Sequence, residues 1–488
     1  MPTDVPELLN TADVTEWEDS ADVIVVGFGV AGACAAIAAA EAGAEVLLLE
    51  RAVASGGTTA LCAGQIYLGG GTPVQEATGI SDDVADMFRY IEAVSPAPDT
   101  EKIRLYCEGS VDHFVWLESL GVPFERSFYA GKAVYQPGTE GLMWTGNELV
   151  WPFRDQARPA PRGHKVAAPG ETGGAELMRI LTKHVESLPI RVQYETRVRN
   201  LIADDTGRVT GVHVTRVGGD PANLRAGSVV LAAGGFVMNK EMIARYTPRL
   251  ASGFMPLGTP GDDGLGIRLG QSAGGVPVHM EGAFMTAAFY PPPQMLNGII
   301  VNGAGQRFVA EDSYHGRTAG SVLAQPDARA YLILDAESTA WPEIPLAPFI
   351  DGWESIEEME AALGIPAGNL VATLAEYNSN AGRSEDPEFH KHPDWLTPLD
   401  AGPWSAFDLS LGKASYVGFT LGGLCTSADG QVLGASGPIA GLYAAGACAS
   451  NIAQDCSGYA SGTCVGEGSF FGRRAGVHAA AEVRAHVS

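Results

Sequence analysis

A phenol and an aliphatic hydroxyl stand close together near the end of the chain, in the segment QDCSGYASG (454–462). Tyr459 and Ser461 are followed by Gly462 and by a glycine-rich segment that is typical of a C-terminal helix. A tyrosine hydroxyl donates a good hydrogen bond to a ketone oxygen, and it can act as a base where neighbouring groups help to form the phenolate, since its ordinary pKa is about 10. The segment therefore indicates carbonyl binding or proton transfer. A core tyrosine beside a helix-capping serine is the structural alternative.

An apolar segment near the N-terminus predicts a dinucleotide site. The β-branched residues 23–26 precede the pattern G-x-G-x-x-G at Gly27, Gly29 and Gly32, and a second apolar run ends at Glu50. These features predict a βαβ unit in which Gly27 permits a tight turn, Gly29 lets backbone approach a pyrophosphate, and Gly32 lets helix pack on strand. Glu50 is expected to accept hydrogen bonds from a ribose. A plain glycine-rich turn is the alternative, but the spacing favours nucleotide binding.

The composition is that of a globular protein with a large core. The chain has 488 residues, of which 46% are hydrophobic, and this length suggests roughly two to four domains. The net charge of −26 disfavours nucleic acid as a partner. The acidic N-terminus shows no secretion signal and the apolar run at 23–40 is broken by glycines, so we expect a cytoplasmic location and no transmembrane segment. The seven cysteines follow no zinc or CxxC spacing, and no metal site is expected.

Five further segments identify the expected cofactor. They are SGGTTALCAG (55–64), SVVLAAGGF (228–236), GDDGLGIRLGQSAGG (261–275), GLYAAGACAS (441–450) and GEGSFFGRRAG (466–476). In this order, over nearly the whole chain, they resemble the FAD-dependent superfamily of fumarate reductases, succinate dehydrogenases and 3-ketosteroid dehydrogenases. The resemblance implies that the chain binds FAD.

The resemblance also implies which residues bind the FAD. The Gly-Gly-Thr turn would wrap the flavin phosphates and ring, Val198 would contact the adenine, and Asp263 matches the acid of the family's TGDG turn. Gly57 stands where succinate dehydrogenases carry the histidine that binds FAD covalently, so non-covalent FAD is expected; Ala447 replaces a frequent glutamate. The expected cofactor-binding residues are Gly27, Gly29, Ala31, Gly32, Glu50, Arg51, Gly56, Gly57, Thr58, Thr59, Gly64, Val198, Ala233, Gly234, Asp263, Gly446 and Gly462.

The family's organisation implies an α/β fold with a discontinuous domain. A Rossmann-like FAD-binding domain is expected at 1–281 and 412–488, around an inserted α+β catalytic or cap domain at 282–411. Within the insertion, 354–362 and 368–379 are predicted as helices. A ligand pocket is expected between the domains. No second G-x-G-x-x-G unit follows, so electrons are expected to pass to an external acceptor other than NAD(P).

Uncharged residues stand where relatives bind a carboxylate. Counting back from FGRRAG places Tyr459 at the position of the arginine that clamps the substrate carboxylate in fumarate reductases. Gly418 and Phe419 precede Thr420 where those enzymes carry a histidine. This predicts a pocket for an apolar carbonyl compound. Arg317 lies near the position of another fumarate reductase arginine, so a reductase of a small unsaturated acid stays an alternative.

A second tyrosine completes the expected catalytic set. Tyr314 matches a tyrosine in the same region of 3-ketosteroid dehydrogenases, and Tyr-Ala-Ser at 459–461 resembles the Δ4-(5α) enzymes more than the Δ1 enzymes. By this resemblance Tyr459, assisted by Ser461, is the base or proton relay, and Tyr314 is its partner in proton transfer or ketone binding. The roles of the two tyrosines could be exchanged. The backbone amide of Gly462 is a further expected donor to the carbonyl.

The leading hypothesis is therefore desaturation of a steroid ketone, at C4–C5 of a 5α-3-ketosteroid. Such a reaction needs a base for the proton next to the carbonyl and a hydride acceptor, here flavin N5. Desaturation at C1–C2, reduction of a small acid, and electron storage without an organic substrate stay open. His164 and His315 are expected to be surface or hydrogen-bonded groups rather than bases. Wall or core positions are expected for Phe284, Met285, Phe289, Tyr416 and Phe419.

Overall fold

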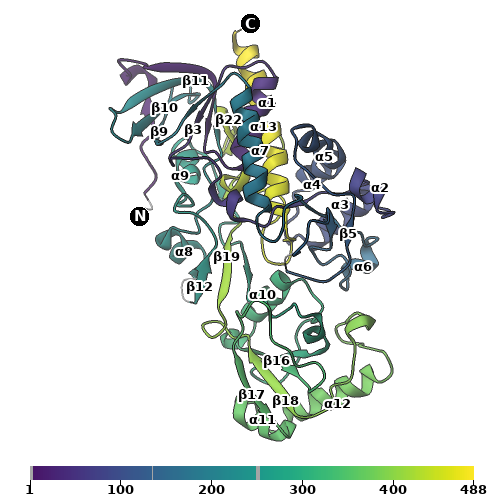
Figure 1. Ribbon diagram of the computed structural model, residues 1–488. Coiled ribbons are helices and arrows are strands. Elements are labelled where there is room, and N and C mark those ends of the chain that lie inside the picture. The colour runs from purple at the N-terminus through teal and green to yellow at the C-terminus, as the bar shows by residue number, and fades with distance from the viewer. Residues whose placement is uncertain (1–3, 135, 249–252, 488) are drawn as a thin grey trace.

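The computed structural model describes residues 4–134, 136–248 and 253–487. Figure 1 shows an upper part, which holds both described ends of the chain, and a lower part built on a separate sheet. Strand β19 (Tyr416–Thr420) runs between them, where it pairs with β14 (Ala283–Thr286) and β12 (Phe254–Pro256). Within the described ranges, no helix combines the length and the apolar character needed to cross a bilayer.

The predicted βαβ unit lies at the centre of the upper part. Strand β2 (Asp19–Val26), helix α1 (Val30–Glu41) and strand β3 (Val46–Leu49) follow one another, and β2 pairs with β3 in parallel. Val23 and Val25 pack into the core on one face of the sheet, and Ile24 and Val26 into the core on the other. Because both faces are buried, the strand needs a continuous apolar run rather than an alternating one.

The sheet around this unit draws on distant segments. Within the described residues it has nine strands, in the order β1-β9-β10-β11-β2-β3-β8, with β22 pairing with β11 and β21. β22, from the C-terminal part of the chain, pairs in parallel with β11, which explains why the predicted FAD domain is discontinuous. The bounds are β1 (Leu9–Asn10), β8 (Ile190–Gln193), β9 (Thr196–Ala203), β10 (Val209–Arg216), β11 (Ala222–Leu231), β21 (Gln431–Gly434) and β22 (Gly437–Ala444).

Three helices cover one face of this sheet. In Figure 1, α1, α7 (Gly173–Ser187) and α13 (Thr463–Val487) run side by side. Gly468, Gly472 and Gly476 recur every four residues and so share one face of α13. A Cβ on Gly472 would lie 2.5 Å from the Ala31 carbonyl oxygen, so α13 packs on α1 almost backbone to backbone. The other face carries α9 (Leu265–Ser272).

A smaller unit of the upper part borders the start of α13. Its sheet has the order β4-β7-β6-β5, and the N–H of Tyr67 in β4 donates to the Gly462 carbonyl at 3.1 Å. The bounds are β4 (Gln65–Tyr67), β5 (Phe128–Tyr129), β6 (Leu142–Met143), β7 (Gly163–Lys165), α2 (Pro73–Ala77), α3 (Val84–Val94), α4 (Thr100–Glu108), α5 (Ser110–Ser119) and α6 (Phe153–Gln156).

The lower part is the α+β unit expected from the sequence. Strands β15 (Ile299–Asn302), β16 (Ala330–Leu334), β18 (Trp404–Asp408) and β17 (Phe349–Trp353) form its sheet in this order. Helices α11 (Ile356–Leu363) and α12 (Asn369–Ala381) confirm the two predicted helices within two residues. Helix α10 (His315–Leu323) lies between this part and the upper one (Figure 1). The α/β fold is confirmed, and the division at 281/282 and 411/412 stays a prediction.

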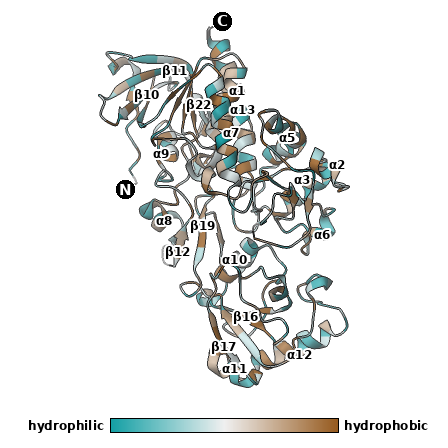
Figure 2. Cartoon of the chain, viewed as in Figure 1, coloured by the Kyte–Doolittle hydropathy of each residue, from teal (hydrophilic) through white to brown (hydrophobic). Residues whose placement is uncertain are grey.

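The hydropathy of the elements matches their positions. In Figure 2 the sheet strand β16 is mostly brown, whereas the surface helix α8 (Lys240–Tyr246) is mostly teal. The remaining elements are β13 (Pro277–Val278), β20 (Gly423–Leu424) and the 3-10 helices Thr11–Asp13, Gly57–Leu61, Pro293–Asn297, Pro326–Ala328, Pro393–Trp395 and Gly446–Cys448.

The close contact between α13 and α1 gives a stability prediction. Gly472→Ala should lower the free energy of unfolding by about 1–3 kcal/mol, because the new methyl group meets backbone that cannot easily move. Gly468→Ala is the matched control on the same helix, since its Cβ would lie 3.5 Å from its nearest neighbour. Thermal or denaturant unfolding of both variants with excess FAD checks this. Equal stability of the two variants would contradict the packing.

Candidate functional site

A long cavity lies along the carboxyl ends of the central strands. It has a volume of about 1010 Å³ and reaches from Glu195–Arg199 and Thr215–Val217 past the turn at Gly27 to Tyr459 and Cys464. Such a volume is at the upper end of the range for ligand pockets. Charged and polar side chains gather at the first end, and the residues around Tyr459 are uncharged.

The turn between β2 and α1 brings backbone to the cavity wall. Gly27 has a φ of +104°, and a Cβ there would lie 2.4 Å from the Ala232 carbonyl oxygen, so only glycine fits. Gly29 directly precedes α1, whose first N–H groups are unpaired within the helix and suit a phosphate. The Val30 N–H already donates to the Thr59 hydroxyl at 3.2 Å. This hydrogen bond joins the turn at Gly56 and Gly57 to the turn at Gly27 and Gly29.

Glu50 lies where a ribose-binding acid is expected. Its carboxylate accepts the N–H groups of Phe28 and Ala52, both at 2.8 Å. A carboxylate has about four acceptor positions, so two remain for the hydroxyl groups of a ribose. The Glu50 side chain thus fixes the turn and still faces the cavity.

Most of the predicted cofactor-binding residues line this cavity. Gly32 instead packs on the turn, where a Cβ would lie 1.9 Å from the Gly27 carbonyl oxygen, which is the predicted helix-to-strand contact. Gly56 donates to the Phe28 carbonyl at 2.8 Å, and Gly64 packs against Gly173 of α7. The lining residues are Gly27, Gly29, Ala31, Glu50, Arg51, Gly57, Thr58, Thr59, Val198, Ala233, Gly234, Asp263 and Gly446.

Two neighbouring aspartates at the cavity wall bind different groups. Asp263 receives Arg51 at 2.8 Å and Arg197 at 3.3 Å, so it holds two arginines at the charged end of the cavity. Asp262 accepts the Thr58 hydroxyl and, at 3.2 Å, the Gly235 N–H. The sequence analysis missed Asp262 because the pattern matched only Asp263, and the contact with Thr58 spans 204 residues of sequence.

The donor set fits FAD. Backbone N–H groups at the start of α1 suit a pyrophosphate, Glu50 suits a ribose, and the uncharged end suits an isoalloxazine ring and an apolar substrate. In the described part of the chain no histidine lines the cavity, so the wall lacks the group to which succinate dehydrogenases attach FAD. Gly57 takes that place with a φ of +51°.

Aromatic rings enclose the uncharged end. The Tyr459 ring lies 4.5 Å from the Phe284 ring and 5.4 Å from the Phe419 ring, measured between centroids. Phe284, Tyr314, Leu421, Ala453 and Tyr459 form one buried cluster. Burial raises the pKa of Tyr459 and of Tyr314 well above the ordinary value, so both phenols are protonated at neutral pH.

The two expected catalytic hydroxyls from distant segments meet here. The Tyr314 hydroxyl is hydrogen-bonded to the Ser461 Oγ at 2.8 Å. Ser461 therefore pairs with Tyr314 rather than with Tyr459, which it was expected to assist. The Gly462 carbonyl is used by Tyr67, whereas no described residue accepts a hydrogen bond from the Gly462 N–H. That N–H remains available as a donor.

Other candidate groups point elsewhere. Arg317 donates to the Trp151 carbonyl at 3.0 Å, and its guanidinium lies 5.0 Å from the centre of the Phe153 ring. His164 is hydrogen-bonded to the Thr72 hydroxyl at 2.7 Å, and burial lowers its pKa to about 4. His315 contacts the Thr286 hydroxyl at 3.0 Å, and burial lowers its pKa to about 3. Tyr416 donates to the Leu409 carbonyl at 2.6 Å in the core, and Met285 and Phe289 also lie there.

A buried carboxyl group supports the floor of the uncharged end. Glu467 of α13 accepts the N–H groups of Ile452 at 2.9 Å and Ala453 at 3.3 Å. Burial raises the pKa of Glu467 to about 7, although these hydrogen bonds and Lys102 oppose the rise. The folded protein therefore binds a proton at Glu467 that the unfolded chain releases above its ordinary pKa of 4.5.

Known flavoproteins are similar to this chain over most of its length. The family described as FAD binding domain matches residues 22–469. The chain is 30% identical over 510 residues to the 3-oxo-5-alpha-steroid 4-dehydrogenase of Comamonas testosteroni, with 90% of this chain and 94% of the relative covered. It is 28% identical over 484 residues to a fumarate reductase (cytochrome) of Shewanella frigidimarina, with 95% and 77% covered.

A solved structure is similar over the whole length. The chain superposes with a TM-score of 0.91 and 42% identity on the 3-ketosteroid-delta4-(5alpha)-dehydrogenase of Rhodococcus jostii RHA1, solved in complex with 4-androstene-3,17-dione. The match covers 97% of this chain and 99% of that one.

The raised pKa of Glu467 predicts a pH-dependent loss of stability. Because the folded pKa lies above the unfolded one, the contribution of this group is complete below about pH 4.5 and is lost as the pH rises through 7. The unfolding free energy of Glu467→Gln minus that of the wild type should therefore rise by roughly 2–3 kcal/mol from pH 5 to pH 8, because only the wild type loses the contribution of Glu467. Unfolding measured with excess FAD at both pH values checks this. Glu337→Gln, at an exposed position, is the control, and parallel pH profiles of wild type and Glu467→Gln would contradict the prediction.

Proposed function

The chain belongs to the family of FAD-binding flavoproteins, and we propose that it introduces the C4–C5 double bond into saturated 5α-3-ketosteroids. The match confirms the predicted FAD cofactor and the oxidoreductase class. One observation carries the proposal: the Tyr314 hydroxyl is hydrogen-bonded to Ser461, and the Tyr314 ring lies 6.5 Å from the ring of Tyr459, which lines the uncharged end of the cavity. The names of the Comamonas and Rhodococcus relatives support the same reaction.

The walls of this end suit an apolar ketone. Phe419 and Tyr459 offer ring surface to the cavity, Phe284 packs against both rings, and the residues that line the cavity there carry no charge in the described part of the chain. A steroid ring system gains from burial against such walls, whereas a dicarboxylate would lose its hydration without a cation to pair with. Arg317, the one arginine named for an acid substrate, is held by Trp151 and Phe153.

Two donors can bind the 3-oxo group. The Tyr459 hydroxyl borders the cavity, and the Gly462 N–H has no acceptor among the described residues. Hydrogen bonds to the ketone oxygen stabilise the negative charge that develops as the neighbouring C–H bond ionises. By analogy with oxyanion holes, each donor contributes roughly 10²- to 10³-fold. Tyr459 and Gly462 therefore orient the ketone and acidify the proton at C4.

The Tyr314–Ser461 pair then serves as the proton relay. Of the two tyrosines, Tyr314 is the one with a hydrogen bond to Ser461, so we assign the relay to it and ketone binding to Tyr459. Burial raises the pKa of Tyr314, and its hydrogen bond with Ser461 opposes that rise. The Tyr314 oxygen takes up the C4 proton as its own hydroxyl proton passes to Ser461, and the partly exposed Ser461 releases a proton to solvent, which avoids a stable phenolate in this apolar surrounding.

FAD held non-covalently by the turn after β2 and by Glu50 would supply a hydride acceptor, its N5 atom. The residues of the uncharged end would hold the steroid with C4 toward the Tyr314–Ser461 pair. Desaturation at C1–C2 would use the same carbonyl groups with a different placement of the steroid. We propose an external acceptor other than NAD(P) for the electrons, because the chain has one dinucleotide-binding βαβ unit in its described residues.

Anaerobic mixing tests the proposed reaction. A saturated 5α-3-ketosteroid should bleach the flavin absorbance and yield a Δ4-3-ketone, whereas the Δ4-3-ketone itself should cause no bleaching. Bleaching by the Δ4 compound would instead indicate C1–C2 chemistry. If neither steroid bleaches the flavin and fumarate oxidises the pre-reduced flavin, the protein is instead a reductase of a small unsaturated acid.

The proton relay predicts a matched pair of variants. Tyr314→Phe should slow flavin bleaching by the 5α-3-ketosteroid by roughly 10²- to 10⁴-fold, because the relay loses its hydroxyl. Tyr416→Phe also removes a buried tyrosine hydrogen bond, at 2.6 Å to the Leu409 carbonyl, but outside the site. Stopped-flow absorbance of both variants with FAD bound gives the comparison. Equal rates for the two variants would remove Tyr314 from the chemistry.

A further inference from the structure

A short segment, residues 145–148, contacts both members of the proton relay. The Thr145 carbonyl accepts the Ser461 N–H at 2.9 Å. Two residues later, the Asn147 Oδ1 accepts the Tyr314 N–H at 2.9 Å. Tyr314 is separated from Asn147 by 167 residues and lies at the start of α10, so this hydrogen bond joins the smaller unit of the upper part to the helix between the two parts.

The segment is held in place from several sides. The Asn147 N–H donates to the Tyr90 hydroxyl at 2.7 Å. Glu148 folds back to accept the Gly146 N–H at 3.0 Å and receives the Tyr67 hydroxyl at 2.9 Å. Tyr67 is the residue whose own N–H binds the Gly462 carbonyl. Residues 145–148 and the turn at Ser461 and Gly462 are therefore both hydrogen-bonded to Tyr67.

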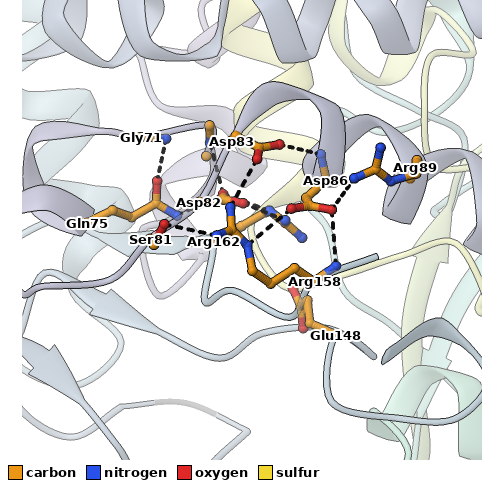
Figure 3. A network of polar contacts seen from close by, with 12 residues as sticks. Gly71, Gln75, Ser81, Asp82, Asp83, Asp86, Arg89, Glu148, Arg158 and Arg162 are labelled. Atoms are coloured by element: carbon orange, nitrogen blue, oxygen red, sulfur yellow. Dashed lines mark hydrogen bonds and ion pairs between the residues drawn. The ribbon is translucent and has the colours of Figure 1, made fainter. Parts of the chain in front are cut away.

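A buried ion pair stiffens this support. Arg162 binds Asp82 through two hydrogen bonds, at 3.0 and 2.7 Å, and both side chains are fully buried. Figure 3 shows Arg162 next to Asp82, with Glu148 in the same view. Its guanidinium also lies 5.5 Å from the centre of the ring of Tyr90, whose hydroxyl accepts the Asn147 N–H. A paired and hydrogen-bonded ion pair of this kind fixes the geometry of the groups around it.

Tyr314 depends on Asn147 at the end opposite its hydroxyl. As the residue before the first turn of α10, Tyr314 has no helical acceptor for its N–H. The fully buried side chain of Asn147 supplies that acceptor, and Ser461 binds the hydroxyl at the other end. A small rotation of Tyr314 about its backbone would carry its hydroxyl away from Ser461.

We propose that Asn147 is a positioning residue, which holds the Tyr314 hydroxyl in register with Ser461 for proton transfer. The inference rests on the proposed steroid dehydrogenation. Asn147 acts through Tyr314: its hydrogen bonds go to the Tyr314 N–H, the Tyr90 hydroxyl and the Val150 N–H. Its loss should therefore affect the chemical step and leave steroid affinity unchanged.

The first test compares turnover by holoenzyme variants. Asn147→Ala should lower kcat by about 10- to 100-fold with an unchanged KM, since a displacement of about 1 Å at a reacting group can cost 10²-fold. Asn147→Asp keeps the acceptor oxygen and should return the rate to within about threefold of wild type. Asn302→Ala is the matched control, because Asn302 also accepts two backbone N–H groups, at 3.0 and 3.1 Å, but lies in β15 away from the site.

The second test is a double-mutant cycle with Tyr314→Phe. If Asn147 acts through the Tyr314 hydroxyl, Asn147→Ala should cost less than about threefold once that hydroxyl is absent. An equal loss in both backgrounds would reduce Asn147 to a general structural role and overturn the inference. Should Asn147→Ala fail to fold, Asn147→Leu fills the same space without an acceptor and is used in the same cycle.

The outcomes separate this inference from the proposed function. Wild-type bleaching by the 5α-3-ketosteroid together with a near-normal kcat in Asn147→Ala would overturn the positioning role alone. Absence of bleaching in the wild type with every 3-ketosteroid would overturn the proposed function and the positioning role with it.

Discussion

The hydrogen bond between the Tyr314 and Ser461 hydroxyls is the contact on which the proposed chemistry depends. It joins residues that are 147 positions apart, one at the start of α10 and one before α13. The pairing of β14 with β19 and the segment at 145–148 bring these positions together. Because the pair is surrounded by apolar rings, an unmade hydrogen bond here would cost about 1–3 kcal/mol. In the proposed reaction the pair is therefore both a structural requirement and the proton relay.

The cavity separates two kinds of chemistry along its length. At one end Arg51 and Arg197 share Asp263, and the turn after β2 offers N–H groups to phosphates. At the other end Tyr459 and Phe419 provide rings and a single phenol hydroxyl. A charged cofactor half and an apolar substrate can thus be bound in one continuous space.

The elements that were predicted correctly from the sequence are those that short-range patterns determine. The βαβ unit and the helices at 356–363 and 369–381 follow from short-range periodicity and glycine spacing, and they are confirmed. The FAD family followed from ordered motifs and is confirmed too. The partner of Ser461 and the role of Asp262 depend on contacts across 147 and 204 residues, which no local pattern encodes. Asn147 belongs to no motif in the sequence, and the positioning role proposed for it depends on its contact with the residue before α10.

The most direct measurement is the isotope effect on flavin bleaching in a single anaerobic turnover. The substrates are 5α-3-ketosteroids that carry deuterium at C5 or, separately, at C1, the two carbons from which a hydride could leave. Hydride loss from C5 predicts slower bleaching with deuterium at C5 and an unchanged rate with deuterium at C1. Slower bleaching with deuterium at C1, together with an unchanged rate with deuterium at C5, would contradict C4–C5 dehydrogenation.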